Sequence, residues 1–275
     1  SFEDLLKKGF GKYSTILLED EKLINKYENK IGNKLFNKDL VTLNLFNWCE
    51  IYLQRFPIKL ISFSNIVFND FKIKKTSINI RIKRFSDIFI SLILIFLVFP
   101  FVLISSLLIK IEDNGPILYS QVRNGYKGSK FNIYKLRTMK IDSEKDGPQW
   151  SNKNDSRVTN IGKFLRTTRL DELPQLINVL SGKMSLIGPR PERPEFDEML
   201  KEKIPFYEKR YEIKPGLSGW AQVNYPYGAS IDDTANKLSY DLFYIKNFSI
   251  WLDLLIFFKT IKLICNAKGS HPNEK

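Results

Sequence analysis

The sequence predicts an α+β fold that is mostly helical and associates with a membrane, and three observations lead to this prediction. A long uncharged stretch follows the first third of the chain, a polar stretch rich in turns comes next, and an aromatic stretch lies near the C-terminus. We therefore expect a hydrophobic helix and interfacial amphipathic helices around a small globular domain.

Composition limits the partners and the chemistry. The 275 residues hold 43 Lys and Arg against 30 Asp and Glu, which gives a formal net charge of +13. This surplus favours an anionic partner, such as a phosphorylated substrate, a nucleic acid or an acidic membrane face. The two cysteines, Cys49 and Cys265, are far apart, and the one histidine, His271, lies in a polar tail. Zinc and histidine chemistry are therefore disfavoured, and a metal bound by oxygen ligands would be Mg²⁺ or Mn²⁺.

The chain divides into four predicted regions. We expect a connector or scaffold over residues 1–80, a membrane helix over 81–112, the globular domain over 113–235, and an interfacial helix with a tail over 236–275. No signal peptide is visible, and the first residue is Ser rather than Met. We therefore expect a processed form or a piece of a longer protein.

The uncharged run from Ile88 to Ile109 has the length of a membrane span, roughly 33 Å as a helix. Pro100 removes a hydrogen bond near its middle, so a break is expected there, with Ser105 or Ser106 bonding the freed carbonyls. Basic residues flank both sides: Lys72, Lys74, Lys75, Arg81, Lys83 and Arg84 before, and Lys110, Arg123, Lys127 and Lys130 after. Basic flanks favour the cytoplasm. We therefore prefer a re-entrant helix to a simple span or a buried core helix.

The remaining stretches predict particular elements. FNIYKLRTM, residues 131–139, reads as a strand, and KFLRTTRLDELPQLINVLSG, residues 163–182, as two helices joined by a turn. The second of these helices is expected to end at Ser181–Gly182. The aromatic stretch 238–265, which includes Trp251, is expected to be a helix in the membrane interface, with a core helix as the alternative.

The adjacent acids Asp171 and Glu172 are the candidate catalytic residues. Asp171 is expected to cap the helix 172–180, with Pro174 in its first turn. There the helix dipole and nearby arginines should keep the Asp171 carboxylate ionised, as a nucleophile or a metal ligand. Neighbouring helical positions diverge by about 100°. We therefore expect one acid to attack a phosphoryl group and the other to hold a cation, with ordinary capping as the alternative.

Arginines near the acids are the candidate phosphate ligands. Arg157, Arg166 and Arg169 precede the acids, whereas Arg190 and Arg193 follow them in GPRPERP. Arg190 stands between two prolines, so a purely structural rigid turn is the alternative for this motif.

Together these motifs resemble one family. From about residue 81 to 265, the chain resembles the bacterial sugar transferases, the monotopic polyprenyl-phosphate phosphoglycosyl transferases. The landmarks are IKRFSDI, the break at Pro100, GPILYSQVRNG, FNIYKLRTM, DSRVTNIGKFLRTTRLDELPQLINVLSGKMSLIGPRPE, KPGLSGWAQVN and KLSYDLFYIKN. One departure is Phe99, because shorter members of the family have Ser before the proline.

The resemblance implies a reaction and residue roles. A UDP-sugar would donate its sugar-1-phosphate to polyprenyl (undecaprenyl) phosphate and release UMP, with Mg²⁺ as the cofactor. Asp171 would form a covalent phosphosugar intermediate, Glu172 would bind Mg²⁺, and Arg166 and Arg190 would stabilise phosphate charge. The resemblance also implies the cytoplasmic face of the bacterial inner membrane and the initiation of lipid-linked exopolysaccharide, capsule or O-antigen assembly.

Other interpretations stay open. A membrane-bound, Mg²⁺-dependent glycosyltransferase would release UDP, and a scaffold of polysaccharide assembly would use the acids only as caps. Nucleic-acid binding is disfavoured, because the basic residues flank apolar segments. The expected partners are a UDP-sugar, polyprenyl phosphate and membrane lipids, and Trp220 with the aromatic C-terminus could alternatively form a homo-oligomer interface.

Overall fold

The computed structural model describes residues 15–17, 41–43, 45–61, 77–145, 147, 155–226, 228 and 230–266. The chain forms two compact units, Ser1–Phe68 and Asn69–Lys275, which are described separately. Most of the predicted connector 1–80, the basic residues Lys72, Lys74 and Lys75, and the tail with His271 lie outside the described residues.

The described part of the first unit is small. Strands β1 (Thr15–Leu17) and β2 (Val41–Leu43) pair in parallel. A short helical segment follows, made of α3 (Leu45–Trp48), a π-helical turn (Cys49–Leu53) and a 3-10 turn (Ile58–Leu60). Phe46 and Phe56 are buried and stack with ring centroids 4.8 Å apart. Among its described residues, this unit offers no catalytic arrangement.

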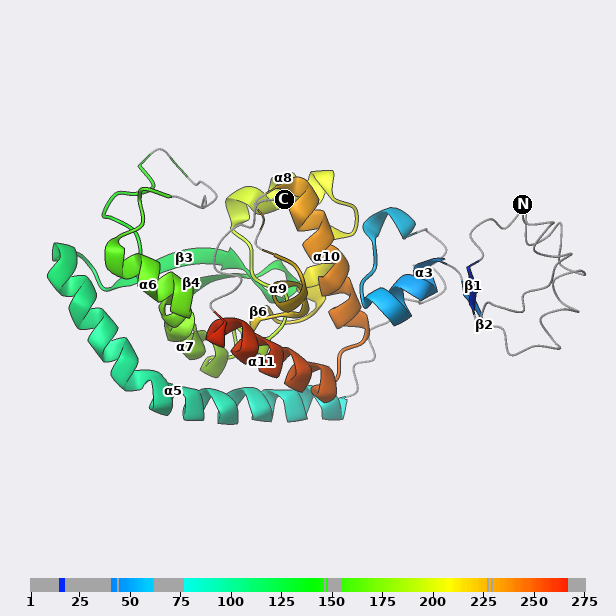
Figure 1. The fold of residues 1–275 in the computed structure, drawn as a ribbon, viewed down its shortest axis with the longest axis horizontal. Helices are drawn as coiled ribbons and strands as arrows, with labels where there is room; N and C mark the ends of the chain where they lie inside the picture. Colours follow the sequence, from blue (N-terminus) through cyan, green and yellow to red (C-terminus); the bar gives the residue numbers. More distant parts are fainter. Residues whose placement is uncertain are drawn as a thin grey trace, which may run out of the picture. The chain divides into compact units, whose positions relative to one another are not determined.

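The second unit contains the predicted motifs and is mostly helical (Figure 1). Its helices are α5 (Ser77–Asp113), α6 (Asn160–Thr168), α7 (Leu176–Leu180), α8 (Pro194–Lys203), α9 (Trp220–Asn224), α10 (Ile231–Lys246) and α11 (Ile250–Cys265). Its strands are β3 (Leu118–Asn124), β4 (Lys130–Leu136), β5 (Ser185–Ile187) and β6 (Gly216–Ser218), and 3-10 helices cover Tyr126–Gly128, Leu170–Gln175 and Tyr207–Glu212. The α+β, mostly helical prediction is confirmed.

Two small sheets organise this unit. Strands β3 and β4 form an antiparallel hairpin in which Leu118 pairs with Leu136, and the strand predicted at FNIYKLRTM is confirmed as β4. Strands β5 and β6 pair in parallel. Leu136 at the end of β4 packs with Ile109 of α5 and Leu165 of α6 in one apolar cluster. This cluster fixes the end of the long helix against the elements that carry the acids.

The long apolar helix is continuous through Pro100, which corrects the predicted break. All residues of α5 are helical, and Figure 1 shows the helix changing direction about midway along its length. Proline removes one backbone hydrogen bond and its ring crowds the preceding turn, which bends a helix without ending it. Ser106 donates its hydroxyl hydrogen bond to the Val102 carbonyl, at 2.7 Å.

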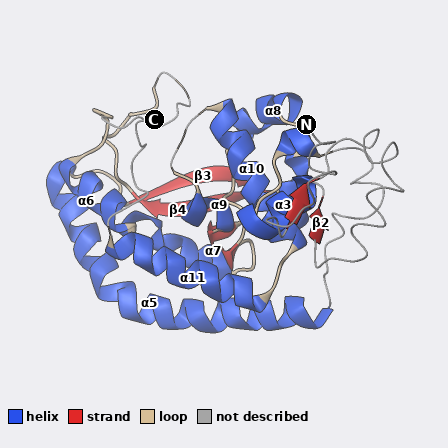
Figure 2. Ribbon diagram, turned by 45° about the vertical axis from the view of Figure 1, so that its right-hand side comes forward, coloured by secondary structure: helices blue, strands red, loops and turns tan. Residues whose placement is uncertain are grey.

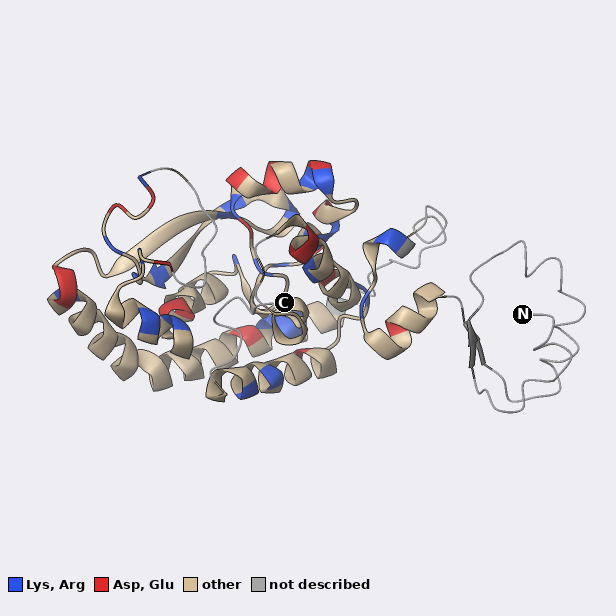
Figure 3. Ribbon diagram, turned by 45° about the horizontal axis from the view of Figure 1, so that its top comes forward, with Lys and Arg blue, Asp and Glu red and all other residues tan. Residues whose placement is uncertain are grey.

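The surface of α5 has the character of a membrane segment. The helix is long and apolar enough to cross a membrane, by length and composition. Most of its large apolar side chains are exposed, and Phe96 is 82% exposed, so α5 is not a buried core helix. Figure 3 shows a long tan stretch without charged residues in α5. These observations support membrane association, and the path through the membrane stays a prediction.

The aromatic C-terminal stretch forms two helices with different surroundings. Helix α10 is a core helix, with Leu242 and Tyr244 buried, so the interfacial prediction is wrong for this half. Helix α11 exposes much of its apolar surface, and Trp251 is 82% exposed. Figure 2 shows α11 beside α5, and Lys83 and Asp253 join the two helices through a 2.7 Å ion pair. Helices α5 and α11 are therefore neighbours, and both expose apolar side chains.

Candidate active site

The two acids lie in a 3-10 turn between α6 and α7. Arg169 ends α6 with a left-handed backbone, φ = 59°, and the 3-10 helix Leu170–Gln175 starts directly after it. Asp171 is therefore not the helix cap that the sequence predicted, because the change of direction falls at Arg169. The predicted end of the second helix is confirmed, since α7 ends at Leu180 and Gly182 has φ = +80°.

A cavity of about 1680 Å³ opens at this turn. Six of the seven candidate residues line it: Arg166, Arg169, Asp171, Glu172, Arg190 and Arg193. The seventh, Arg157, does not line it. Its guanidinium donates to Asp155 over 2.8 and 2.6 Å, so its charge is already paired. The structure thus brings together the predicted residues of α6, the acidic turn and the Pro-Arg-Pro turn.

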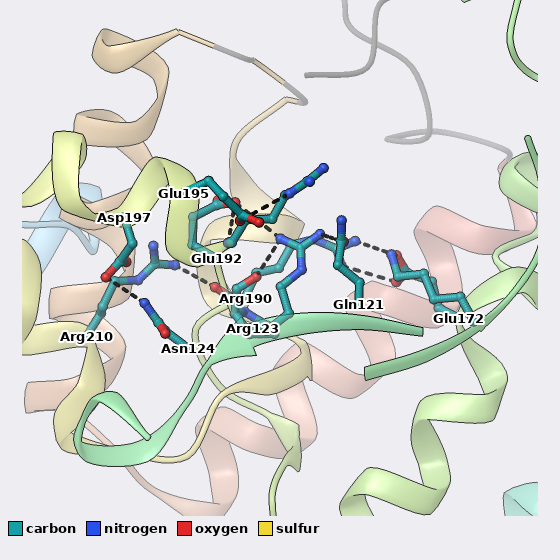
Figure 4. Close-up of polar contacts among 12 residues, drawn as sticks. Gln121, Arg123, Asn124, Glu172, Arg190, Glu192, Glu195, Asp197 and Arg210 are labelled. Atoms are coloured by element: carbon teal, nitrogen blue, oxygen red, sulfur yellow. Dashed lines mark hydrogen bonds and ion pairs between the residues drawn. The ribbon is translucent and has the colours of Figure 1, made fainter. Parts of the chain in front are cut away.

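Glu172 is the centre of a buried charge cluster. Arg190 donates two hydrogen bonds to its carboxylate, and Lys135 of β4 donates a third over 3.1 Å. Figure 4 shows the Arg190 side chain reaching Glu172. Burial alone would raise the pKa of Glu172, but the charges of Arg190 and Lys135 outweigh it and hold the pKa well below its ordinary value. Glu172 is therefore an anion at any physiological pH.

Asp171 has the opposite environment, although it is the next residue. Its side chain is buried, and its Oδ1 atom makes no hydrogen bond with the described residues. Burial, together with the adjacent charge of Glu172, raises the pKa of Asp171 to about 6. The sequence predicted that positive charge would dominate here. The cations lower this pKa, but burial and Glu172 prevail, so Asp171 is ionised only above about pH 6.

Lys135 is the main site residue that the sequence reasoning missed. It shares a face of β4 with the buried residues Phe131 and Ile133, and burial lowers the pKa of its ammonium group. The signal was the alternation of the strand, because residues at i, i+2 and i+4 point to one side. A lysine on the apolar side of a strand needs an anionic partner, and Glu172 supplies it.

Close backbone packing places Arg166. Its Nε donates to the Thr138 hydroxyl at 2.9 Å, in the segment that follows β4. One turn earlier in α6, Gly162 lies against the Thr138 carbonyl, where a Cβ atom would overlap the oxygen. The side chain of Thr159 caps this helix by accepting from the Gly162 N–H at 2.9 Å. Helix α6 therefore approaches the strand end closely enough to project Arg166 into the cavity.

The Pro-Arg-Pro turn follows β5 and is held through its carbonyl groups. Pro189 accepts from the Gly216 N–H at 2.9 Å, and Arg190 accepts from the Arg210 guanidinium at 2.7 Å. Pro191 accepts from Arg123 at 3.3 Å, as part of the contacts in Figure 4. The rigid-turn and phosphate-site interpretations are therefore compatible, since the turn is fixed while the Arg190 side chain reaches the cavity.

The carboxylate oxygens of Asp171 and Glu172 are suitable ligands for Mg²⁺, provided that a cation bonded to Glu172 moves away. Carboxylate oxygens are suitable ligands, and the Asp171 Oδ1 atom has no other hydrogen-bond partner in the described part of the chain. The described residues hold no group of three or more Asp, Glu, His or Cys residues arranged for a metal. Both Glu172 oxygens are bonded to cations. A metal would therefore need substrate oxygens as further ligands and would have to displace a cationic partner of Glu172.

Comparison with known proteins gives the same assignment from two directions. The family model described as bacterial sugar transferase matches residues 78–267. The chain is 49% identical over 189 residues to "UDP-N-acetylgalactosamine-undecaprenyl-phosphate N-acetylgalactosaminephosphotransferase" from Aeromonas hydrophila, over 69% of this chain and 45% of that protein.

This chain spans a larger share of two other relatives than of the Aeromonas protein. "UDP-glucose:undecaprenyl-phosphate glucose-1-phosphate transferase" from Caulobacter vibrioides is 39% identical over 72% of this chain and 74% of its own length. "Exopolysaccharide production protein PSS" from Rhizobium leguminosarum is 40% identical over 66% of this chain and 93% of its own length. The chain thus spans less than half of the Aeromonas relative but most of these two. The chain belongs to the bacterial sugar transferase family.

Proposed function

We propose that this chain transfers a sugar-1-phosphate from a UDP-sugar to polyprenyl phosphate and releases UMP. One observation carries the proposal: within the part of the chain that the structure describes, a buried oxygen of Asp171 has no hydrogen-bond partner, and it lies beside the cluster of Glu172, Lys135 and Arg190. An ionised carboxylate with an oxygen free of donors is available as a nucleophile. The adjacent cations provide the positive charge that two anionic phosphates require.

In the first step, an oxygen of Asp171 attacks the phosphorus that carries the sugar. A new carboxylate–phosphorus bond forms, the bond from that phosphorus to the bridging oxygen breaks, and the electron pair leaves with UMP. Arg166 and Arg190 are available for this step because both line the cavity that contains Asp171. Arg166 comes from helix α6, and Arg190 comes from the Pro-Arg-Pro turn. Their role is to offset the negative charge of the attacked and departing phosphates.

In the second step, an oxygen of polyprenyl phosphate attacks the same phosphorus. The bond to Asp171 breaks, the carboxylate is regenerated, and the sugar diphosphate lipid leaves. No external base is needed, because both nucleophiles are already anions at neutral pH.

We expect Glu172 to hold Mg²⁺, which when bound would offset the negative charge of the donor diphosphate. Electron paramagnetic resonance of Mn²⁺ with a UDP-sugar tests this independently of activity: the wild-type protein should bind the ion, and Glu172→Gln should not. Equal binding by both proteins would exclude Glu172 as the ligand.

The acceptor implies a membrane location, which we propose to be the cytoplasmic face of the bacterial inner membrane. Glu112 and Asp113, at the end of the apolar helix α5, line the cavity, so the helix leads to the acids. A re-entrant path would leave both ends of α5 on the side of the UDP-sugar. Single cysteines at the two ends, labelled from the cytoplasmic side, should then both react. Labelling of only one end would indicate a span instead.

The test of the proposed function is nucleotide release. The purified membrane protein is incubated with Mg²⁺, undecaprenyl phosphate and a panel of UDP-sugars, and UMP is assayed separately from UDP. The relatives' names direct the panel first to UDP-N-acetylgalactosamine and UDP-glucose. We expect UMP with one donor, and Asp171→Asn should abolish it while membrane association stays intact. Release of UDP would support a glycosyltransferase, and release of neither would support the scaffold.

A further inference from the structure

One buried arginine outside the predicted set links the Pro-Arg-Pro turn to helix α10. Arg210, in the 3-10 helix Tyr207–Glu212, is only 8% exposed. Its guanidinium donates to the Arg190 carbonyl and the Tyr207 hydroxyl, both at 2.7 Å, and to the Asp241 carboxylate at 3.3 Å. Figure 4 shows Arg210 meeting the turn on the side away from Glu172.

Asp241 is the anionic partner of this arginine. It lies on α10, is 2% exposed and lines the same cavity as the acids. Burial raises the pKa of Asp241 to about 6, against the opposing charges of Arg210 and Lys237. Burying such a pair is costly, and removing one partner leaves the other charge uncompensated. A function that offsets this cost is the hydrogen bond by which Arg210 holds the Arg190 carbonyl.

The Pro-Arg-Pro turn is fixed through its carbonyl oxygens. Pro189 and Pro191 have no backbone N–H group that could donate a hydrogen bond. Of the three consecutive carbonyls, Pro189 is bonded by a backbone N–H, whereas Arg190 and Pro191 are bonded by the side chains of Arg210 and Arg123. Arg210 holds the very residue whose guanidinium reaches Glu172. A shift of this carbonyl would move the base of the Arg190 side chain.

We propose that Arg210, neutralised by Asp241, is a positioning residue that sets where the Arg190 guanidinium lies relative to Glu172. The arrangement of charges follows from the contacts alone, and its consequence for catalysis rests on the proposed function. Arg210 acts through Arg190 and is not itself a ligand of the acids. Loss of Arg210 should therefore disturb an interaction in which it takes no part, namely the Arg190–Glu172 pair.

A double-mutant cycle on stability tests this without any substrate. Thermal unfolding midpoints of the purified protein in detergent are measured for the wild type, Arg190→Gln, Glu172→Gln and the double variant. The same four proteins are then measured with Arg210→Met. We expect a stabilising coupling between Arg190 and Glu172 in the first set and its loss in the second. An unchanged coupling with Arg210→Met would overturn the proposal.

Two further variants keep the test decisive. If Arg210→Met does not fold, Asp241→Asn leaves Arg210 in place without its counter-ion, and the coupling should be weakened. The matched control is Lys83→Met, which leaves the half-buried Asp253 carboxylate without its cation between helices α5 and α11, away from the residues that line the cavity. It should lower the midpoint while leaving the coupling intact. A coupling lost equally in the control would show that any destabilised variant loses it, and would overturn the proposal.

Activity provides a second, separate readout. With a donor identified by UMP release, Arg210→Met should lower the single-turnover rate by about the same factor as Arg190→Gln. The double variant should be no slower than Arg190→Gln alone, because both changes remove one function. Multiplied losses would mean an independent structural role. If the wild type releases no UMP, the proposed function fails, and the stability cycle still decides the positioning role.

Discussion

Asp171 and Glu172 show how two adjacent carboxylates acquire different properties from their surroundings. Glu172 is clamped by Arg190 and Lys135, which hold its pKa well below the ordinary value despite burial. Asp171 is buried, and its Oδ1 atom has no hydrogen-bond partner among the described residues. Burial and the charge of Glu172 raise its pKa to about 6. Such a pair can divide the work, one acid as a permanent anion that organises cations and the other as a nucleophile.

The first prediction concerns the pH dependence of the chemical step. Because only ionised Asp171 can attack, the single-turnover rate of nucleotide release should rise by about tenfold per pH unit below pH 6 and level off above it. Stopped-quench assays from pH 5 to 8 would measure this profile. A rate that is flat over this range would contradict the assignment of Asp171 as the group that must lose a proton.

The second prediction concerns stability. Since the folded pKa of Asp171, about 6, lies above the ordinary value of 3.8, the group favours the fold below pH 3.8, and this contribution is lost as the pH rises through 6. Asp171→Asn should therefore stabilise the protein at pH 7.5, by on the order of 2 kcal/mol. The gain should shrink toward pH 4.

Thermal unfolding midpoints at the two pH values check this prediction. Glu208→Gln serves as the control, because its side chain is 73% exposed and should give no comparable gain. A midpoint of Asp171→Asn at pH 7.5 no higher than that of the wild type would mean that the buried carboxylate is not under electrostatic strain.

The third prediction concerns Lys135. Lys135→Met removes one of the cations that face Glu172, so the rate of nucleotide release should fall by roughly 10²-fold, as for the loss of one electrostatic donor in an active site. Lys130→Met is the matched control, because Lys130 lies on the same strand and is exposed. A Lys135→Met rate close to that of this control would exclude Lys135 from the catalytic cluster.

Most of the site residues could be predicted from the sequence, and the residues that were missed or misassigned have physical explanations. Asp171, Glu172, Arg166, Arg169 and Arg190 were predicted and line one cavity. Lys135 was missed because it comes from a strand distant in the chain, and its pairing depends on tertiary contact. Arg157 was assigned by proximity in sequence, but the nearer Asp155 takes its charge. The ionisation of Asp171 was misjudged because burial cannot be read from a local motif.

At the scale of elements, the close approach of α6 to the end of β4 sets the geometry of the acidic turn. Gly162 faces the Thr138 carbonyl with no room for a Cβ atom, and Arg166 bonds the Thr138 hydroxyl one turn later. A helix normally gains stability when Gly is replaced by Ala. At Gly162, a Cβ atom would overlap the Thr138 carbonyl, so replacement by Ala should destabilise the protein. The substitution therefore tests the close contact between α6 and the end of β4.

The fourth prediction is that Gly162→Ala lowers stability by about 1–3 kcal/mol, because overpacking outweighs helix propensity. It should also slow nucleotide release, since α6 would have to move away and take Arg166 with it. Thermal unfolding and the UMP assay measure the two effects. Lys163→Ala, an exposed change on the same helix, is the control for stability only, because Lys163 also lines the cavity. A stabilised Gly162→Ala protein would contradict the close approach.

Elements with strong local signals were predicted well, whereas their surroundings were not. The strand β4 and the end of α7 follow from apolar runs and from glycine. The sequence does not distinguish the exposed helix α11 from the buried helix α10, because both are rich in aromatic residues. Trp220 is 1% exposed and stacks on Phe243, so it does not contribute to the homo-oligomer surface considered from the sequence.

At the scale of the whole second unit, the exposed apolar helices are connected to the cavity through the end of α5. Exposed apolar side chains cover α5 and α11, which lie side by side and are joined by Lys83 and Asp253. The far end of α5 reaches the cavity through Glu112 and Asp113. A reaction between a soluble sugar nucleotide and a lipid phosphate requires this combination of a membrane surface and a polar site.

The covalent intermediate is the central claim, and one measurement tests it most directly. The protein is incubated with the donor UDP-sugar and Mg²⁺ but without polyprenyl phosphate, and mass spectrometry of its peptides is combined with an assay of nucleotide. The account predicts one phosphosugar on the peptide that contains Asp171, with an equal amount of UMP, and neither product from Asp171→Asn. UMP formed without the adduct, an adduct on another residue, or release of UDP would contradict it.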